Sequence, residues 1–159
     1  MVIDWDRFRE FLIEARISTC NTEPEIDKNG SKIVRCDRGD FGYERIYDGV
    51  TVFIGSEIGF FVDGSKRERI WRANYQENID KFALNALLST LQLRGTSLDR
   101  ILPHFRKPVM PAPLNYPFGD ALEYKTKTSG GILGFREEID FLYGGVPVYT
   151  RISHGGEIV

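Results

Sequence analysis

The chain contains few of the residues that build metal sites and disulfide frameworks. Its 159 residues include two cysteines and two histidines. Cys20 and Cys36 lack the paired spacing of a zinc or redox motif, so we expect free thiols rather than a disulfide. His104 and His154 fall short of the three or four donors of a metal site unless acidic side chains from elsewhere converge on them. We therefore expect no metal and no cofactor.

Long apolar runs are also missing. No segment approaches the ~20 apolar residues of a membrane-spanning helix. The first residues, with Asp4, Asp6 and Glu10, do not show the basic-then-apolar pattern of a signal peptide. The net charge of -2 and the apolar fraction of 42% are those of an ordinary soluble domain. We expect one cytoplasmic domain over residues 1–159 that does not bind membranes.

Common catalytic and nucleotide-binding motifs do not occur either. The sequence has no Gly-x-Ser-x-Gly elbow, no phosphate loop and no dinucleotide fingerprint. Gly130-Gly131 leads into an extended segment, whereas a phosphate-binding loop requires a helix at that point. No enzyme class therefore follows from a motif.

One stretch of the sequence occurs as an internal repeat. After one inserted residue, an offset of eighty-one brings matching residues together. The matches are Tyr43 with Tyr124, Gly49 with Gly130, Glu57 with Glu138, Ile58 with Ile139, Phe60 with Phe141 and Gly64 with Gly145. Unrelated segments share about one position in fifteen to twenty. We therefore predict two copies of one β-rich unit, about 1–76 and 77–159, related by a pseudo-twofold axis.

Apolar residues at helical spacing predict two amphipathic helices. The first covers Met1 to about Ala15, with Asp4 placed to cap it. The second covers about Asn78 to Leu93, where Arg94 and Gly95 supply a C-terminal stop. Each helix is expected to bury its apolar side.

Two segments are expected to form little regular structure. Residues 22–38 are polar and predict a loop with at most a short strand at Ile33-Val34. Five prolines between residues 103 and 117 exclude a helix or a central strand there. We expect this second segment to form an ordered strap over the surface.

Alternating residues predict a β-meander after each helix. The first runs from Phe41 to about Tyr75 and the second from Asp120 to Ser153, with glycine-containing turns in both. A meander leaves one face in water, which helices can cover. We therefore predict the α+β class, with a duplicated helix-plus-meander unit and the helices packed on the sheet. Periodicity leaves open whether the meanders join edge to edge, pack face to face or curl into a partial barrel.

Several repeated segments resemble a known family. They are Gly39-Asp40-Phe41-Gly42-Tyr43, Phe53 to Ile58, Trp71 followed by Tyr75, Glu138-Ile139, Pro147-Val148-Tyr149 and His154-Gly155-Gly156. In this order they resemble, over nearly the whole chain, the family known as domain of unknown function 5680. The resemblance implies no reaction. Members occur alone or joined to XRE-type helix-turn-helix regulators, which implies a sensory or regulatory role. The chain departs from the family pattern at Gln76-Glu77, where two glycines are expected.

Glu57 and Glu138 are the sharpest candidates for chemistry. A pseudo-twofold axis could bring the two carboxylates together, where like charges raise one pKa and create an acid and a base. Each alternates with an apolar neighbour, Ile58 or Ile139, so both are expected to face solvent or a groove. The alternative is that each pairs with a cross-strand Arg or Lys and serves only the fold. His154, which precedes two glycines, is a further candidate for a polar contact in a pocket.

A basic cluster lies next to aromatic residues. It consists of Lys66, Arg67, Arg69 and Arg72, beside Trp71. Cations next to aromatic rings can bind single-stranded nucleic acid. However, the chain is slightly acidic, and the cluster is expected in a hairpin loop that the second unit lacks. We therefore expect a solvated turn and no nucleic-acid partner.

Aromatic residues make up 13% of the chain. Tyr43, Tyr47, Trp71, Tyr124 and Tyr149 recur at repeat positions, where they could line a concave pocket or form the core. With Glu57, Glu138 and His154 they complete the set of candidate ligand-binding residues. The expected function is a non-enzymatic binding module for a small molecule or a protein partner, with a homodimer as one possible form. The alternative is an acid-base enzyme that uses Glu57, Glu138 or His154.

Overall fold

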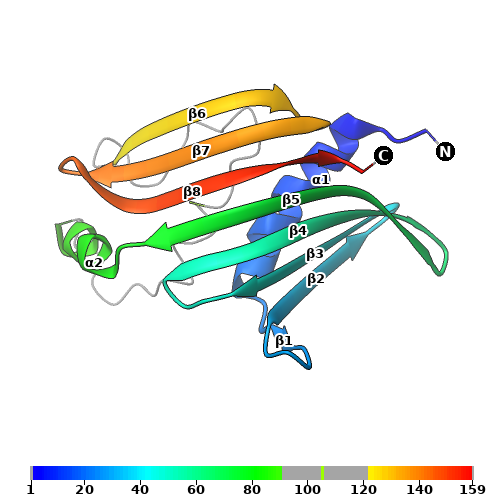
Figure 1. Ribbon diagram of the computed structural model, residues 1–159, viewed down its shortest axis with the longest axis horizontal. Coiled ribbons are helices and arrows are strands. Elements are labelled where there is room, and N and C mark those ends of the chain that lie inside the picture. Colours follow the sequence, from blue (N-terminus) through cyan, green and yellow to red (C-terminus); the bar gives the residue numbers. More distant parts are fainter. Residues whose placement is uncertain (1, 91–104, 106–121, 159) are drawn as a thin grey trace.

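A computed structural model describes residues 2–90, 105 and 122–158 of the protein. The elements are α1 (Trp5–Ser18), the 3-10 helix η1 (Thr19–Asn21), β1 (Glu25–Ile26), β2 (Lys32–Arg38), β3 (Phe41–Asp48), β4 (Val52–Asp63), β5 (Lys66–Ile79), α2 (Lys81–Thr90), β6 (Glu123–Gly131), β7 (Gly134–Tyr143) and β8 (Val146–Glu157). These helices and the single antiparallel sheet confirm the α+β class (Figure 1). The strap expected between 103 and 117 lies outside the described residues except for Phe105. No described helix is long and apolar enough to cross a membrane.

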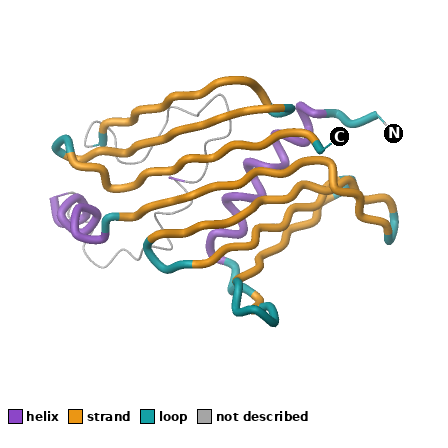
Figure 2. The backbone as a smooth tube through the Cα atoms, in the orientation of Figure 1, coloured by secondary structure: helices purple, strands orange, loops and turns teal. Residues whose placement is uncertain are grey.

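The two meanders join edge to edge in one eight-stranded sheet. The strand order is β1-β2-β3-β4-β5-β8-β7-β6, and every neighbouring pair is antiparallel. The last strands of the two meanders, β5 and β8, pair in the middle over residues 71–79 and 149–157. The long central strands are visible in Figure 2. The unit boundary expected near residue 76 falls inside β5 rather than after it.

Alternation of side chains gives the sheet two different faces. α1 crosses one face, which we call the inner face; Figure 1 shows the helix behind the strands. Phe8 contacts Phe41 on β3 and Trp71 on β5, at ring-centroid distances of 5.4 and 6.0 Å. No described helix contacts the opposite side, which we call the outer face. The two faces are therefore expected to have different roles.

The predicted cap of α1 is confirmed. The Asp4 carboxylate accepts a hydrogen bond from the backbone N–H of Arg7 at 3.1 Å, which satisfies one free donor of the first turn. The helix continues to Ser18, three residues beyond the predicted end at Ala15. It buries Phe8, Phe11, Leu12, Ala15 and Arg16. One charged side chain, Arg16, is therefore buried on the otherwise apolar side of this helix.

The second helix begins later than predicted. Asn78 and Ile79 complete β5, and the Asp80 carboxylate then accepts a hydrogen bond from the N–H of Ala83 at 2.9 Å. α2 lies beside the end of the sheet in Figure 1. Its buried side chains join a cluster that includes Phe105 and Tyr149. The predicted helix began too early because Ile79 fits the helical spacing of apolar residues. Ile79 is indeed buried, but as the last residue of β5.

The segment predicted as a loop at 22–38 contains β1 and β2. β2 pairs with β3 over seven residues, so it is a full strand of the sheet. Val34 is buried, whereas the neighbouring Arg35 is exposed and pairs with Glu44 at 2.7 Å. Charged residues on the exposed side obscured the alternation that would have identified this strand.

Gly59 allows α1 to approach the sheet, which leads to a prediction. A Cβ added at Gly59 would overlap the end of the Phe8 ring and lie 3.3 Å from Trp71 Cβ. Phe8 and Trp71 are both 0% exposed, so neither can move aside. Gly59→Ala is expected to destabilise the fold by about 1–3 kcal/mol in chemical denaturation.

Gly134→Ala is the matched control for this substitution. Gly134 also lies in a strand, and an added Cβ there would meet nothing within 4 Å. Its free energy of unfolding is expected to change by no more than about 0.5 kcal/mol. Equal effects at Gly59 and Gly134 would contradict the role given to the helix contact.

Candidate functional site

The aromatic candidates lie on the inner face and form core rather than a pocket wall. Tyr43, Trp71 and Tyr149 are each 0% exposed. Tyr47 and Tyr124 are partly buried and pack against the core cluster that contains Tyr149. Of the two alternatives that the sequence left open, the structure favours the core over the small-molecule pocket. The sequence could not separate them, because aromatic residues are common in strands whether they line a pocket or fill the core.

Glu57 is completely buried between α1 and the sheet. Arg16 of α1 donates to both of its carboxylate oxygens, from Nε at 3.0 Å and from Nη2 at 2.6 Å. Tyr43 donates its hydroxyl to Oε1 at 2.7 Å, and Arg151 of β8 donates Nη2 to Oε2 at 3.0 Å. One carboxylate therefore joins the helix, β3, β4 and β8.

The charges around Glu57 continue across the inner face. Arg151 also donates Nη1 to Glu77 at 2.8 Å, and we call Arg16, Glu57, Arg151 and Glu77 the buried ion network. Arg45 lies opposite Glu57 in the β3–β4 register and is also buried. Glu137 of β7 is 1% exposed. The described inner face thus buries three arginines and three glutamates, which can be accommodated only if they are closely paired.

The pKa values of Glu57 and Glu137 are shifted in opposite directions. Burial alone would raise the pKa of Glu57, but Arg16 and Arg151, with hydrogen bonds from Arg16 and Tyr43, hold that pKa far below its usual range. Burial raises the pKa of Glu137, and the same two arginines only partly oppose the shift. Glu57 is therefore held as an anion, whereas Glu137 takes up a proton more readily than an exposed glutamate does.

The predicted pairing of Glu57 with Glu138 is wrong. Residues 135, 137, 139 and 141 of β7 share the inner face, so Glu138 lies on the outer face. There it accepts a hydrogen bond from Arg136 Nη2 at 2.8 Å. The sheet therefore separates the two carboxylates, and the neighbouring Glu137, not Glu138, shares the inner face with Glu57. The expectation that Glu57 faces solvent or a groove is also wrong, because its side chain is completely buried.

The basic cluster lies within β5 and not in a hairpin loop. The loop ends at Ser65, because β5 begins at Lys66. Arg67 pairs with Asp37 at 2.9 Å and lies 4.3 Å from the Phe60 ring centroid. Arg69 and Arg72 instead line a hollow on the outer face. The loop prediction is wrong because the turn before β5 is short and the strand already begins at the first residue of the cluster.

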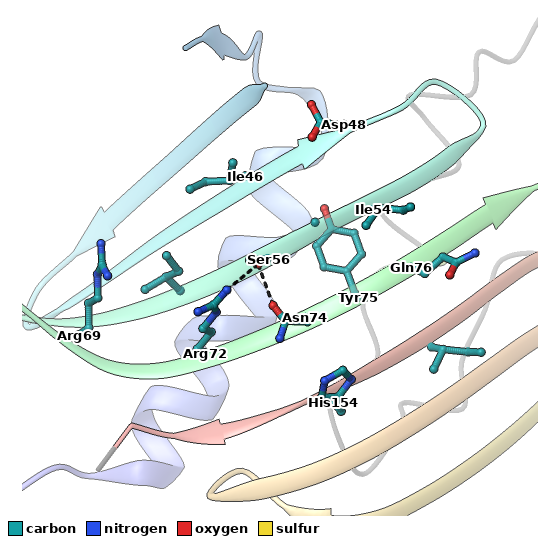
Figure 3. Close-up of a pocket in the computed structure, with 13 residues that line it drawn as sticks. Ile46, Asp48, Ile54, Ser56, Arg69, Arg72, Asn74, Tyr75, Gln76 and His154 are labelled. Atoms are coloured by element: carbon teal, nitrogen blue, oxygen red, sulfur yellow. Dashed lines mark hydrogen bonds between the residues drawn. The ribbon is translucent and has the colours of Figure 1, made fainter. Parts of the chain in front are cut away.

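The outer face carries an open hollow of about 700 Å³, which we call the outer groove. Its lining residues are Ile46, Asp48, Ile54, Gly55, Ser56, Ile58, Arg69, Arg72, Asn74, Tyr75, Gln76, Ile152 and His154. They come from β3, β4, β5 and β8, as Figure 3 shows. Ile58 is only 7% exposed although no described helix covers it, so it lies at the bottom of the groove.

Strand register divides the outer groove into three rows. The arginine row holds Ile58 beside Arg72, with Arg69 beyond a β-bulge. The polar row holds Ile46, Ser56, Asn74 and His154 in order across four strands. The isoleucine row holds Asp48, Ile54, Gln76 and Ile152. In Figure 3 the two arginines lie toward one end and Ile54 and Gln76 toward the other.

Arg69 and Arg72 differ from most arginines on the described surface. Arg35, Arg38, Arg67 and Arg136 each pair with a carboxylate. Within the described ranges Arg69 and Arg72 form no such pair, and Arg72 donates only to Ser56 Oγ at 3.5 Å. Ser56 in turn donates to Asn74 Oδ1 at 2.8 Å (Figure 3). The outer groove therefore presents two guanidinium groups that are available to an anion.

His154 is the one sequence-predicted candidate that lines the outer groove. It is exposed on β8 and pairs in register with Asn74. Across the residues that the structure covers, no group of three His, Cys, Asp or Glu side chains could hold a metal ion. His154 is therefore placed as a polar wall residue of the groove.

Known proteins offer no direct guide to this site. No family model, no curated protein and no solved structure matches the chain. The geometry of the outer groove and of the buried ion network is therefore the basis for a functional assignment.

Sequence reasoning missed most residues of both sites. Arg45 and Arg151 carried a signal, because each alternates with a tyrosine that belongs to the core. A charged residue at such a position predicts a buried ion pair. Arg16 carried a weaker signal, since it follows Ala15 on the apolar side of α1. Arg69 and Arg72 were noted only as part of a basic cluster, and Asn74 carried no signal, because its significance arises from residues on other strands.

The opposite pKa shifts of Glu57 and Glu137 generate a prediction. At pH 7, Glu57→Gln is expected to cost about 3–5 kcal/mol, because it leaves Arg16 and Arg151 without their shared anion. The folded-state pKa of Glu57 lies below its unfolded value of about 4.3, so its contribution is full above that pH. The contribution is lost as pH falls toward the folded-state pKa. Urea denaturation from pH 3 to pH 8 measures this profile.

Glu137→Gln is the matched substitution with the opposite sign. In the wild type the folded-state pKa of Glu137 is raised, so its charged carboxylate destabilises the fold above the unfolded pKa of about 4.3. Glu137→Gln is expected to equal or exceed the wild type in stability at pH 7, with the difference shrinking as the pH falls below that value. Loss of stability at pH 7 comparable to that of Glu57→Gln would contradict this assignment.

Proposed function

We propose that the chain is a non-enzymatic binding module whose small-molecule site is the outer groove. The observation that carries this proposal is the presence of Arg69 and Arg72, without carboxylate partners among the described residues, beside buried Ile58. Small-molecule sites combine an apolar surface with a few polar groups that orient the ligand. A volume of about 700 Å³ is suitable for a metabolite-sized ligand.

Binding is favoured over acid-base catalysis by the positions of the titratable groups. Glu57, whose pKa is held far below its usual range, is 0% exposed and cannot reach a substrate in the groove. Asp48 and His154 lie three strands apart, ~14 Å along the sheet. General acid-base catalysis requires groups within hydrogen-bonding reach of the same reacting atoms. The alternative enzyme built on Glu57, Glu138 and His154 therefore has less support.

The internal duplication is also a proposal. It is supported by the strand order, in which two three-stranded meanders meet at their last strands. In the first meander the turns contain Gly49 and Gly64, with φ angles of 110° and 58°. In the second meander the last turn contains Gly145, with 79°, and Gly130, with 77°, lies near the end of β6 just before the first turn. Side chains at the aligned positions Glu57 and Glu138 face opposite ways, so the proposal concerns chain topology and not individual side chains.

Two further attributes stay proposals. A cytoplasmic location is supported by Cys20 and Cys36, which are both free thiols. A sensory or regulatory role is supported by the resemblance of the aromatic-glycine segments to the family of unknown function. Both are compatible with a module that binds a metabolite and does not transform it.

A thermal-shift screen of organic anions, organic cations and neutral metabolites tests the proposed site. An anionic ligand at a hundred times its Kd is expected to stabilise the protein by about 2.7 kcal/mol and raise Tm by about 5–10 °C. Arg72→Gln is expected to remove this shift, because it deletes the charge that binds the anion. Arg72 is exposed, so this variant should keep the Tm of the free protein.

Arg136→Gln is the control variant. Arg136 also lies exposed on the outer face, but it pairs with Glu138 and does not line the outer groove. The ligand-induced shift should survive this substitution. Absence of any stabilising ligand, or shifts that Arg72→Gln leaves unchanged, would argue against the outer groove as the binding site.

A further inference from the structure

The apolar lining of the outer groove is aliphatic. Ile46, Ile54, Ile58 and Ile152 contribute its apolar side chains. Tyr75 also borders the groove, but its ring lies against Arg151, 4.6 Å from the guanidinium carbon, on the inner face. Among the lining residues no phenol, phenyl or indole ring is therefore available to stack on a nucleobase, and the imidazole of His154 is the one aromatic ring that faces the groove. Isoleucine side chains instead provide a surface that an alkyl chain can cover.

Charge is distributed unevenly along the outer groove. Arg69 and Arg72 lie at one end, and the isoleucine row lies at the other. Glu44 is the β3 neighbour of Ile58 and would oppose an anion, but Arg35 binds it at 2.7 Å. Asp48, in contrast, is exposed in the isoleucine row and repels an anion there. A ligand anion therefore has one favourable position, beside the two arginines.

The polar row lies between these two ends. Asn74 and His154 are adjacent on β5 and β8, and Asn74 accepts a hydrogen bond from Ser56. The amide N–H donors of Asn74 and the imidazole of His154 can bond to a polar group of a ligand. From Arg72 to Gln76 the rows span four residues of β5, which corresponds to ~13 Å. A bound chain would thus meet charge, hydrogen-bonding groups and aliphatic surface in that order.

We propose that the outer groove binds an amphiphilic anion with three parts: an oxyanion head, a hydrogen-bonding group next to it, and an aliphatic tail. The head pairs with Arg69 and Arg72. The middle group contacts Asn74 and His154, and the tail covers Ile54 and Ile152. This inference rests on the proposed binding function and specifies its ligand class. An N-acyl amino acid has this order of groups, and a long-chain alkyl phosphate has the head and tail without the middle group.

Isothermal titration calorimetry with three matched probes tests the ligand class. N-octanoylglycine contains all three parts, N-octanoylglycinamide lacks the charge, and N-acetylglycine lacks the tail. N-octanoylglycine is expected to bind at least about tenfold more tightly than either of the others. Octyl phosphate, as a fourth probe, distinguishes a requirement for the middle group from a requirement for any oxyanion with a tail.

Variants assign each part of the ligand to its row. Arg72→Gln is expected to weaken N-octanoylglycine about tenfold and to make the acid and the neutral amide bind equally. Ile152→Thr should weaken both of these probes by a similar factor, because it acts on the tail. Asn74→Leu should reduce the preference for N-octanoylglycine over octyl phosphate. Arg136→Gln should leave all affinities unchanged.

Several results would overturn the inference. They are equal affinity for the acid and the neutral amide, affinity that Arg72→Gln does not reduce, and binding to anionic lipid vesicles without binding to the dissolved probes. If the probes fail but the thermal-shift screen finds another anion that requires Arg72, the ligand class is wrong and the binding function stands. If no ligand depends on Arg72, both are wrong.

Discussion

Burial of the Glu57 carboxylate is the constraint on which the rest of the structure depends. A carboxylate at 0% exposure is stable only when its oxygens are bonded, and the donors come from α1, β3 and β8. Arg16 thereby holds the helix over the sheet, and Arg151 connects the second meander to the first. Removal of either arginine leaves the buried carboxylate with one counter-charge in place of two, so the helix and both meanders are coupled through this one residue.

Strong pairing on the inner face leaves the outer face free for a different role. Because side chains alternate, Glu57 and Ile58 are neighbours in sequence but face opposite sides of β4. The charged residues of the buried ion network pair with one another, whereas Arg69 and Arg72 on the outer face have no carboxylate partner among the described residues. Stability therefore depends on one face, and the proposed binding site uses the other.

Local signals were sufficient for several elements of the fold. The Asp4 cap, the apolar side of α1 and the turns at Gly49, Gly64 and Gly145 each depend on a few consecutive residues, and they were predicted. A turn expected at Gly130-Gly131 is wrong, because both residues belong to β6. β2 was missed because its exposed charges hid its alternation. The candidate site was predicted poorly: of the eight candidate ligand-binding residues, only His154 lines the outer groove, while Glu57 joins the buried ion network.

The sequence by itself determined the α+β class, because helical and strand periods are properties of neighbouring residues. Tertiary structure alone decided which face each strand residue occupies and which strands become neighbours. A shift of one residue reverses the face, so an alignment that matches Glu57 with Glu138 could not show that they lie on opposite sides. The outer groove combines side chains from four strands, and the edge-to-edge pairing of β5 with β8 that brings His154 beside Asn74 forms only when the whole sheet assembles.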